Sequence, residues 1–188
     1  MAQSIATLAR SIARLALAVV LVLASATGFA QPRYGLAPDA YAVFSRWMTA
    51  SCVGDEAPAL HEALRRYRAE LAPAFRQALA EGPSADALRA VRTAAESRYA
   101  ALARLPIGEY RIEGASAQAL AQHRRISRAT FVADQVQRYA AGYRANAVAG
   151  LGIVGGAEAR PVLSRLATRR NDPLALAAAE AIKALDRP

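Results

Sequence analysis

Cysteine, histidine and aromatic residues are all scarce in this sequence. The single cysteine, Cys52, excludes an intrachain disulfide framework and a multi-cysteine metal site. It is expected to be a buried small hydrophobe, and an intermolecular disulfide is the alternative. Two histidines, His61 and His123, leave little material for a metal site or a general base, and no Gly-x-Ser-x-Gly pattern marks a nucleophile. Aromatic residues make up 6% of the chain, which argues against a β-sandwich or barrel. We therefore expect a non-catalytic protein without a metal or cofactor.

The first thirty residues have the pattern of a secretory signal peptide. Arg10 and Arg14 give a positive start, residues 15–23 are an unbroken apolar run, and small residues precede Ala30. We expect cleavage after Ala30 and a mature protein that is periplasmic or secreted. The alternative is an uncleaved membrane anchor, although the uncharged stretch 15–30 is shorter than the roughly 20 residues that span a bilayer.

Negative charge is also in deficit. The leader contains two arginines and no carboxylate, so residues 31–188 keep a net charge of +7. Because export separates the protein from most nucleic acid, we expect no nucleic-acid partner. An anionic envelope surface, either lipid headgroups or cell-wall polymer, is the expected target if the charge has one. The alternative is a solvated face that only keeps the protein soluble.

Helix signals follow one another along the mature chain, and the sequence predicts an all-α protein. Alanine, about a quarter of all residues, favours closely packed helices. Apolar residues recur at three- and four-residue spacing through the N-terminal part. The expected helices there are 40–52, capped by Asp39, then 55–82, kinked or restarted at Pro73, and then 84–105.

Residues 106–115 are expected to form an irregular linker, because glycine and proline interrupt the helical pattern there. A long helix is expected to begin at Ser116 and to run to Gly142. We place the domain boundary at this linker. Residues 31–115 would form an N-terminal helical bundle, and residues 116–188 would form a second helical region packed on it.

Gly150, Gly152 and Gly155 match the dinucleotide-binding pattern G-x-G-x-x-G, and Asp172 lies about twenty residues further on. That motif must follow a strand and open a helix, so that free N–H groups meet the pyrophosphate. Here residues 143–149 favour a helix, which places the glycines at a helix end, where carbonyl groups repel phosphate. We therefore expect no dinucleotide ligand.

The same residues fit an internal repeat. A shift of 31 positions lays residues 143–154 on residues 174–185. Large apolar residues coincide at 143/174, 151/182 and 154/185, and alanine coincides at 147/178. Residues 157–170 are expected to form a helix between the two copies, and Asn171-Asp172-Pro173 is expected to form the following turn and cap.

Residues 143–185 resemble HEAT-like helical repeats, of the short kind also found in phycobiliprotein lyases. The resemblance rests on Arg144, Leu151-Gly152, Gly155, Ala159, Leu163, Asp172-Pro173 and residues 178–185. The second unit departs from the pattern, because Ala175 and Lys183 stand where the first has Arg144 and Gly152. The resemblance implies antiparallel helix pairs stacked as a short α-α superhelix, with the N-terminal helices burying its open end. It does not imply lyase chemistry.

Two groups of arginines are candidate interaction patches. They are Arg124, Arg125 and Arg128, expected on one face of the long helix, and Arg65 and Arg66 with the nearby Arg68. The alternative is that each is a solvated helix face. We expect an exported, non-catalytic interaction or scaffold module for an unidentified protein partner. The alternative function is a basic envelope-binding protein that associates with anionic lipid or cell-wall polymer.

Overall fold

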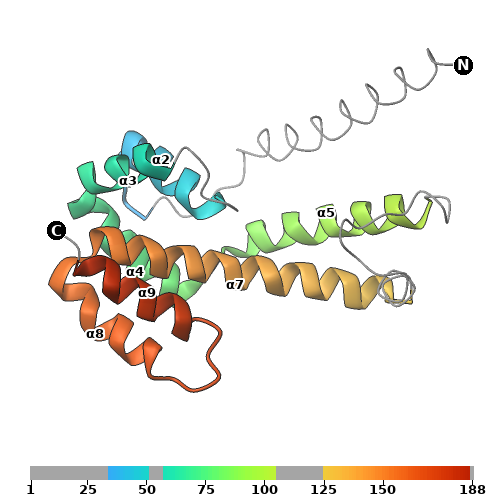
Figure 1. Cartoon of the computed structure of the whole chain (residues 1–188). Helices are drawn as coiled ribbons and strands as arrows, with labels where there is room; N and C mark the ends of the chain where they lie inside the picture. Colours follow the sequence, from blue (N-terminus) through green and yellow to red (C-terminus); the bar gives the residue numbers. More distant parts are fainter. Residues whose placement is uncertain (1–33, 51–56, 105–124, 187–188) are drawn as a thin grey trace, which may run out of the picture. The chain divides into compact units, whose positions relative to one another are not determined.

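A computed structural model describes residues 34–50, 57–104 and 125–186 of the chain. These residues belong to one unit of contacting residues, Pro32–Pro188. Every regular element in the described ranges is a helix, which confirms the all-α prediction (Figure 1). In chain order the helices are α2 (Pro38–Thr49), α3 (Ala57–Arg66), α4 (Arg68–Glu81), α5 (Ala85–Ala103), α7 (Arg128–Val154), α8 (Gly156–Ala167) and α9 (Ala175–Leu185).

α7 is the helix on which the others assemble. It is 27 residues long and contacts all six of the other described helices. Its first half lies along α5, and its second half packs against α4 and α9 (Figure 1). The long helix therefore takes part in two different helix associations along its length.

Apolar side chains form two separate cores. The smaller core contains Ala95 of α5 with Phe131 and Val132 of α7, and partly buried apolar side chains pack around it. The larger core joins α2, α3, α4, α8 and α9 to the second half of α7. Its largest fully buried side chains are Phe44, Leu64, Leu71, Phe75, Val148, Leu151, Val154 and Leu163.

Gly150 and Gly152 let α7 approach two neighbouring helices closely. A Cβ atom at Gly150 would lie 2.6 Å from Cζ of Phe75 in α4, and one at Gly152 would lie 2.8 Å from Cα of Ala181 in α9. Such distances are too short for carbon atoms in a packed interior, so only glycine fits at either position. Gly155 follows as the C-cap residue of α7. The three glycines thus occupy a helix end, as the sequence predicts, and their spacing serves helix packing.

Polar side chains from distant segments satisfy the ends of two helices. The Asn146 amide in α7 donates to the carbonyl oxygen of Met48 at 3.1 Å, and the Trp47 indole N–H donates to the carbonyl oxygen of Asn146 at 2.7 Å. Nε of Arg68 donates to the carbonyl oxygen of Val154 at 3.0 Å. Carbonyl groups in the last turn of a helix have no partner within that helix. These bonds therefore tie the ends of α2 and α7 to their neighbours.

A break at residues 125–127 interrupts the helix predicted over residues 116–142, whose part up to residue 124 lies outside the described residues. α7 begins at Arg128, after Ser127, whose hydroxyl oxygen accepts a hydrogen bond from the N–H of Thr130 at 3.1 Å. A serine at either position suits a helix cap. Beginning the helix after Ser127 carries Phe131 into the small core beside α5, and this tertiary contact is not visible in the local sequence.

α7 also continues through Gly142, where the sequence predicts an end. An exposed glycine inside a helix costs about 1 kcal/mol relative to alanine. Tyr143, Ala147 and Val148, which follow Gly142, are all buried. Their burial outweighs that cost, so the helix runs on to Val154.

Two of the predicted helix boundaries in the N-terminal part are also wrong. α2 begins at Pro38, because proline suits the first helical position, and Asp39 lies within the first turn and does not cap the helix. The break expected at Pro73 falls instead at Tyr67, between α3 and α4. Pro73 lies inside α4, where fully buried residues such as Leu71 hold the helix against the core.

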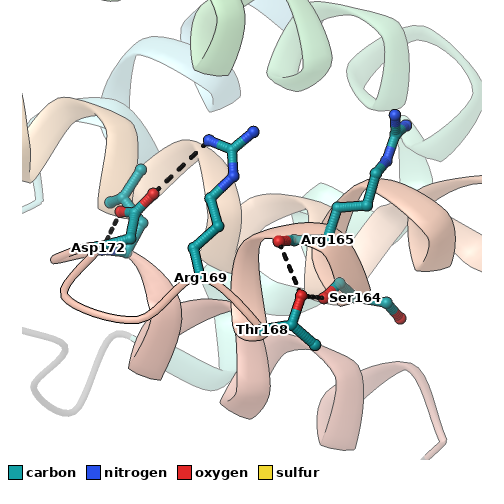
Figure 2. A network of polar contacts seen from close by, with 6 residues as sticks. Ser164, Arg165, Thr168, Arg169 and Asp172 are labelled. Carbon is teal, nitrogen blue, oxygen red and sulfur yellow. Dashed lines mark hydrogen bonds and ion pairs between the residues drawn. The ribbon is translucent and has the colours of Figure 1, made fainter.

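The turn between α8 and α9 agrees with the sequence prediction. Asn171 has a φ of 65°, a left-handed conformation that asparagine tolerates better than most residues. The Asp172 carboxylate accepts a hydrogen bond from the N–H of Leu174 at 2.8 Å. Figure 2 shows the same carboxylate facing Arg169, with 3.7 Å between the closest charged atoms. The Asn-Asp-Pro sequence therefore forms the turn before α9. The helix predicted over residues 157–170 ends earlier than expected, at Ala167 of α8.

The 31-residue offset relates residues with similar environments in α7 and α9. The pairs 143/174 and 147/178 are buried in both helices. Leu151 and Val154 are buried, whereas their equivalents Ile182 and Leu185 are half-buried, since no further described helix follows α9. Helix packing of this kind is compatible with a helical repeat.

Several predictions fall outside the described residues. They are the signal peptide 1–30, Cys52, the linker 106–115 with the domain boundary after it, His123 and Arg124. Within the described ranges, no helix combines the length and the apolar composition that a bilayer span requires.

Candidate functional site

A groove runs along one side of the α5–α7 pair. It is open to solvent and has a volume of about 670 Å³. Its apolar lining, here called the floor, consists of Leu88, Ala129, Val132, Ala133, Val136 and Ala140. Its polar lining consists of Arg92, Glu96, Arg128 and Gln137. Helical spacing explains why these residues share one side, because they recur at intervals of three or four along both helices.

Two polar contacts fix α5 and α7 in antiparallel register beside this groove. Arg128 at the start of α7 forms an ion pair of 3.2 Å with Glu96 of α5. The Tyr99 hydroxyl of α5 donates to the carbonyl oxygen of Ile126 at 3.2 Å. The C-terminal half of α5 thus lies beside the N-terminal end of α7. Leu88 and Ala140, the lining residues furthest from these contacts, therefore mark the opposite end of the groove.

The charge around the groove is positive. Residues 85–104 and 125–142 contain seven arginines and three carboxylates. Glu96 is already paired with Arg128, at 3.2 Å. Arg92 is exposed and forms no ion pair among the described residues. Its guanidinium group is thus the uncompensated charge within the groove lining.

The first predicted arginine patch is only partly assembled. Arg124 lies outside the described residues, Arg125 is exposed in the turn before α7, and Arg128 is the first residue of that helix. Arg125 and Arg128 do not share a helix face, because the helix begins only after Ser127. Of the two described arginines of this patch, Arg128 lines the groove and Arg125 does not.

The second patch is divided between a surface and a helix cap. Arg65 and Arg66 are exposed in the last turn of α3, and Arg66 makes a long ion pair of 3.9 Å with Glu62. Arg68, close to them in sequence, donates instead to the carbonyl oxygen of Val154. The arginines of α3 remain a surface feature, whereas Arg68 has a structural role.

A pair of hydrogen-bonded tyrosines joins the N-terminal segment to α7. The hydroxyl oxygens of Tyr34 and Tyr143 lie 2.8 Å apart. Burial raises the pKa of both hydroxyl groups above the ordinary tyrosine value. A raised pKa keeps both groups protonated at neutral pH, whereas a tyrosine that acts as a base needs a lowered one. The pair therefore suits packing and hydrogen bonding.

His61 is the described histidine, and it contacts Trp47 at 5.6 Å between ring centroids. Burial lowers the pKa of His61, and the neighbouring positive charge of Arg65 lowers it further. The imidazole is therefore neutral at pH 7. Among the described residues, no three His, Cys, Asp or Glu side chains converge in a way that would hold a metal ion.

The sequence does not predict the groove between α5 and α7. Apolar residues recur at three- and four-residue spacing in residues 88–95 and 129–140, which indicates ordinary amphipathic helices. The sequence did not show that one side of these two helices stays uncovered by other described helices. Comparisons of the chain with family models, with curated proteins and with solved structures find no match.

Proposed function

We propose that this protein is an exported, non-catalytic interaction or scaffold module that binds a protein partner. The groove between α5 and α7 is the observation that carries this proposal. An apolar floor with a polar edge is the usual anatomy of a protein-binding surface. Apolar surface that remains open on a folded protein often marks such a site.

The C-terminal helices provide the scaffold in this proposal, as a HEAT-like repeat. The second half of α7 and α9 follow the 31-residue offset, with α8 between them, and Gly152 lets the two equivalent helices meet closely. Repeat stacks of this kind bury a continuous core between neighbouring helices. The N-terminal helices α2, α3 and α4 contribute to the same core.

Export rests on the leader-like sequence of residues 1–30. Cell fractionation with mass determination of the mature protein tests it. A mature chain beginning at Gln31 in the periplasm or medium would support export. A full-length chain in the membrane fraction would favour an anchor.

The interaction is tested by affinity capture with the tagged mature protein from an envelope extract, at low and at high salt. Val136→Glu places a charge on the groove floor, where Val136 is half-buried. We expect this change to reduce recovery of a specific partner by roughly tenfold, because a carboxylate would have to be desolvated at the interface. Val91→Glu is the matched control, since Val91 is also half-buried on α5 but does not line the groove.

Thermal unfolding of both variants must accompany the capture, so that loss of binding is not confused with loss of folding. A partner that survives high salt and depends on Val136 but not on Val91 supports the interaction module. Turnover of a substrate by the purified protein, abolished by one polar substitution, would overturn it.

The alternative is an envelope-binding protein that associates with anionic lipid or cell-wall polymer. The observation in its favour is the surplus of arginine, including the exposed Arg65 and Arg125. Binding of that kind weakens steeply with salt, because screening removes attraction between exposed charges. Capture of lipid or polymer that washes off at high salt would favour this alternative.

A further inference from the structure

The dimensions of the groove match a short helix. On α7 its lining extends from Arg128 to Ala140, and on α5 from Leu88 to Glu96. At 1.5 Å of rise per residue, the longer side measures about 18 Å, or three to four helical turns. The apolar floor follows this direction, in the trough between two helices. A segment that filled the trough would therefore present apolar side chains every three or four residues.

Among the described helices, none adds a third layer to the α5–α7 pair beside the groove. Of the residues that the structure describes, the buried members of the pair's own core are Ala95, Phe131 and Val132. Leu88 and Val136 line the groove and remain half-buried. A third helix in the groove would cover both side chains and convert the pair into a three-helix bundle. Helix packing favours such an arrangement because it buries apolar surface between ridges and grooves.

Charge decides which kind of helix fits. A second copy of this chain would bring the same excess of arginine against the groove, and like charges disfavour that contact. An acidic helix would instead complement Arg92, which has no carboxylate partner among the described residues. We propose that the α5–α7 groove binds an acidic amphipathic helix of a partner protein, a proposal that rests on the proposed interaction function and names its ligand.

The direct test uses two synthetic peptides and the full mature protein. Each peptide has about 14 residues. Its leucines are spaced alternately three and four residues apart, so that they form one stripe as long as the groove. One peptide has glutamate on both sides of the leucine stripe, and the other has lysine there. We expect the acidic peptide to bind at least roughly tenfold more tightly than the basic one, measured as Kd by fluorescence anisotropy.

Arg92→Glu locates the interaction. Arg92 is exposed and unpaired in the described structure, so its reversal leaves folding intact. It exchanges an attraction for a repulsion, and we expect the acidic peptide to bind roughly tenfold more weakly. Arg98→Glu is the matched control, because Arg98 is also exposed on α5 but does not line the groove. The control variant should bind the acidic peptide with a Kd within about twofold of the unmodified protein.

Equal binding of both peptides, or equal effects of Arg92→Glu and Arg98→Glu, would overturn the proposal. Arg92-dependent binding of phosphatidylglycerol vesicles without binding of the acidic peptide would also overturn it, in favour of lipid. If neither peptide binds but envelope capture still depends on Val136, the interaction function stands and the acidic helix is wrong. If the acidic peptide binds through Arg92 but no groove-dependent partner is captured, the groove chemistry stands and the proposed function is wrong.

Discussion

Asn146 is the residue through which α7 holds the end of α2. Its amide nitrogen lies 3.1 Å from the carbonyl oxygen of Met48 and 3.2 Å from that of Ala50. The carbonyl oxygen of Asn146 accepts the Trp47 indole N–H in return. One side chain thus supplies partners that the last turn of α2 cannot find within itself. Half-buried carbonyl groups left without a partner destabilise the folded state.

Asn146→Ala is therefore expected to lower the free energy of unfolding by about 1–3 kcal/mol, because it leaves these carbonyl oxygens without their donor. Urea unfolding followed by circular dichroism measures the change. Gln77→Ala is the control, since Gln77 is exposed and its amide bonds only to Glu81 within α4. A variant of Asn146 as stable as the Gln77 variant would show that the amide does not hold α2.

At the scale of the element, α7 shows how one residue type has opposite effects along a single helix. Gly142 is exposed, and a Cβ atom there would meet no other atom within 4 Å. Gly150 is buried, and a Cβ atom there would lie 2.6 Å from the Phe75 ring. Glycine is thus a cost at the first position and a requirement at the second.

The two glycines predict opposite changes in stability. Gly142→Ala should raise the free energy of unfolding by up to about 1 kcal/mol, because alanine favours the helix. Gly150→Ala should lower it by about 1–3 kcal/mol, because Phe75 must move to accommodate the methyl group. Chemical unfolding of both variants under the same conditions provides the comparison. Equal changes of the same sign would contradict the close contact between α4 and α7.

The features that the sequence predicts correctly are those that depend on residues close together in the chain. Helical spacing predicted the all-α fold, and Asn171-Asp172-Pro173 predicted the turn between α8 and α9. It did not predict the caps supplied by Asn146 and Arg68, because these side chains meet carbonyl groups almost a hundred residues away. Such contacts depend on how helices pack, and helical spacing alone does not encode that.

For the same reason, the sequence predicts single residues of the candidate site but not how they come together. The sequence predicts Arg128 as part of a candidate interaction patch, but its pairing with Glu96 depends on the antiparallel register of α5 and α7. That register follows from burying Phe131 and Val132 against Ala95. The start of α7 at Arg128, set by the Ser127 cap, then separates Arg125 from the helix face on which it was expected.

At the scale of the molecule, the two cores are unequal, and both include α7. The smaller core beside α5 has three buried members, whereas the larger one includes most of the fully buried side chains of the described residues. Regions with few buried apolar contacts open at lower free energy than the rest of a protein. The two halves of α7 are therefore expected to differ in how readily they unfold.

Native-state hydrogen exchange measures this difference. Amides in residues 132–140 should exchange at least roughly tenfold faster than those in residues 146–152, because the smaller core protects the first group and the larger core protects the second. Both groups belong to one continuous helix, so helix formation alone predicts equal protection at interior positions. Uniform exchange along α7 would show that the two cores unfold together.

Because α7 contributes to both cores, it is a junction between two cooperative folding units if the cores open separately. A ligand that binds only the folded state of one unit stabilises that unit by mass action and leaves the local opening of the other unchanged. Occupation of the groove would accordingly slow exchange in α5 and the first half of α7, while the helical stack around the second half keeps its own opening rate. A ligand in the groove, as proposed, would thus add order beside α5 without altering the stability of the helices around the second half of α7.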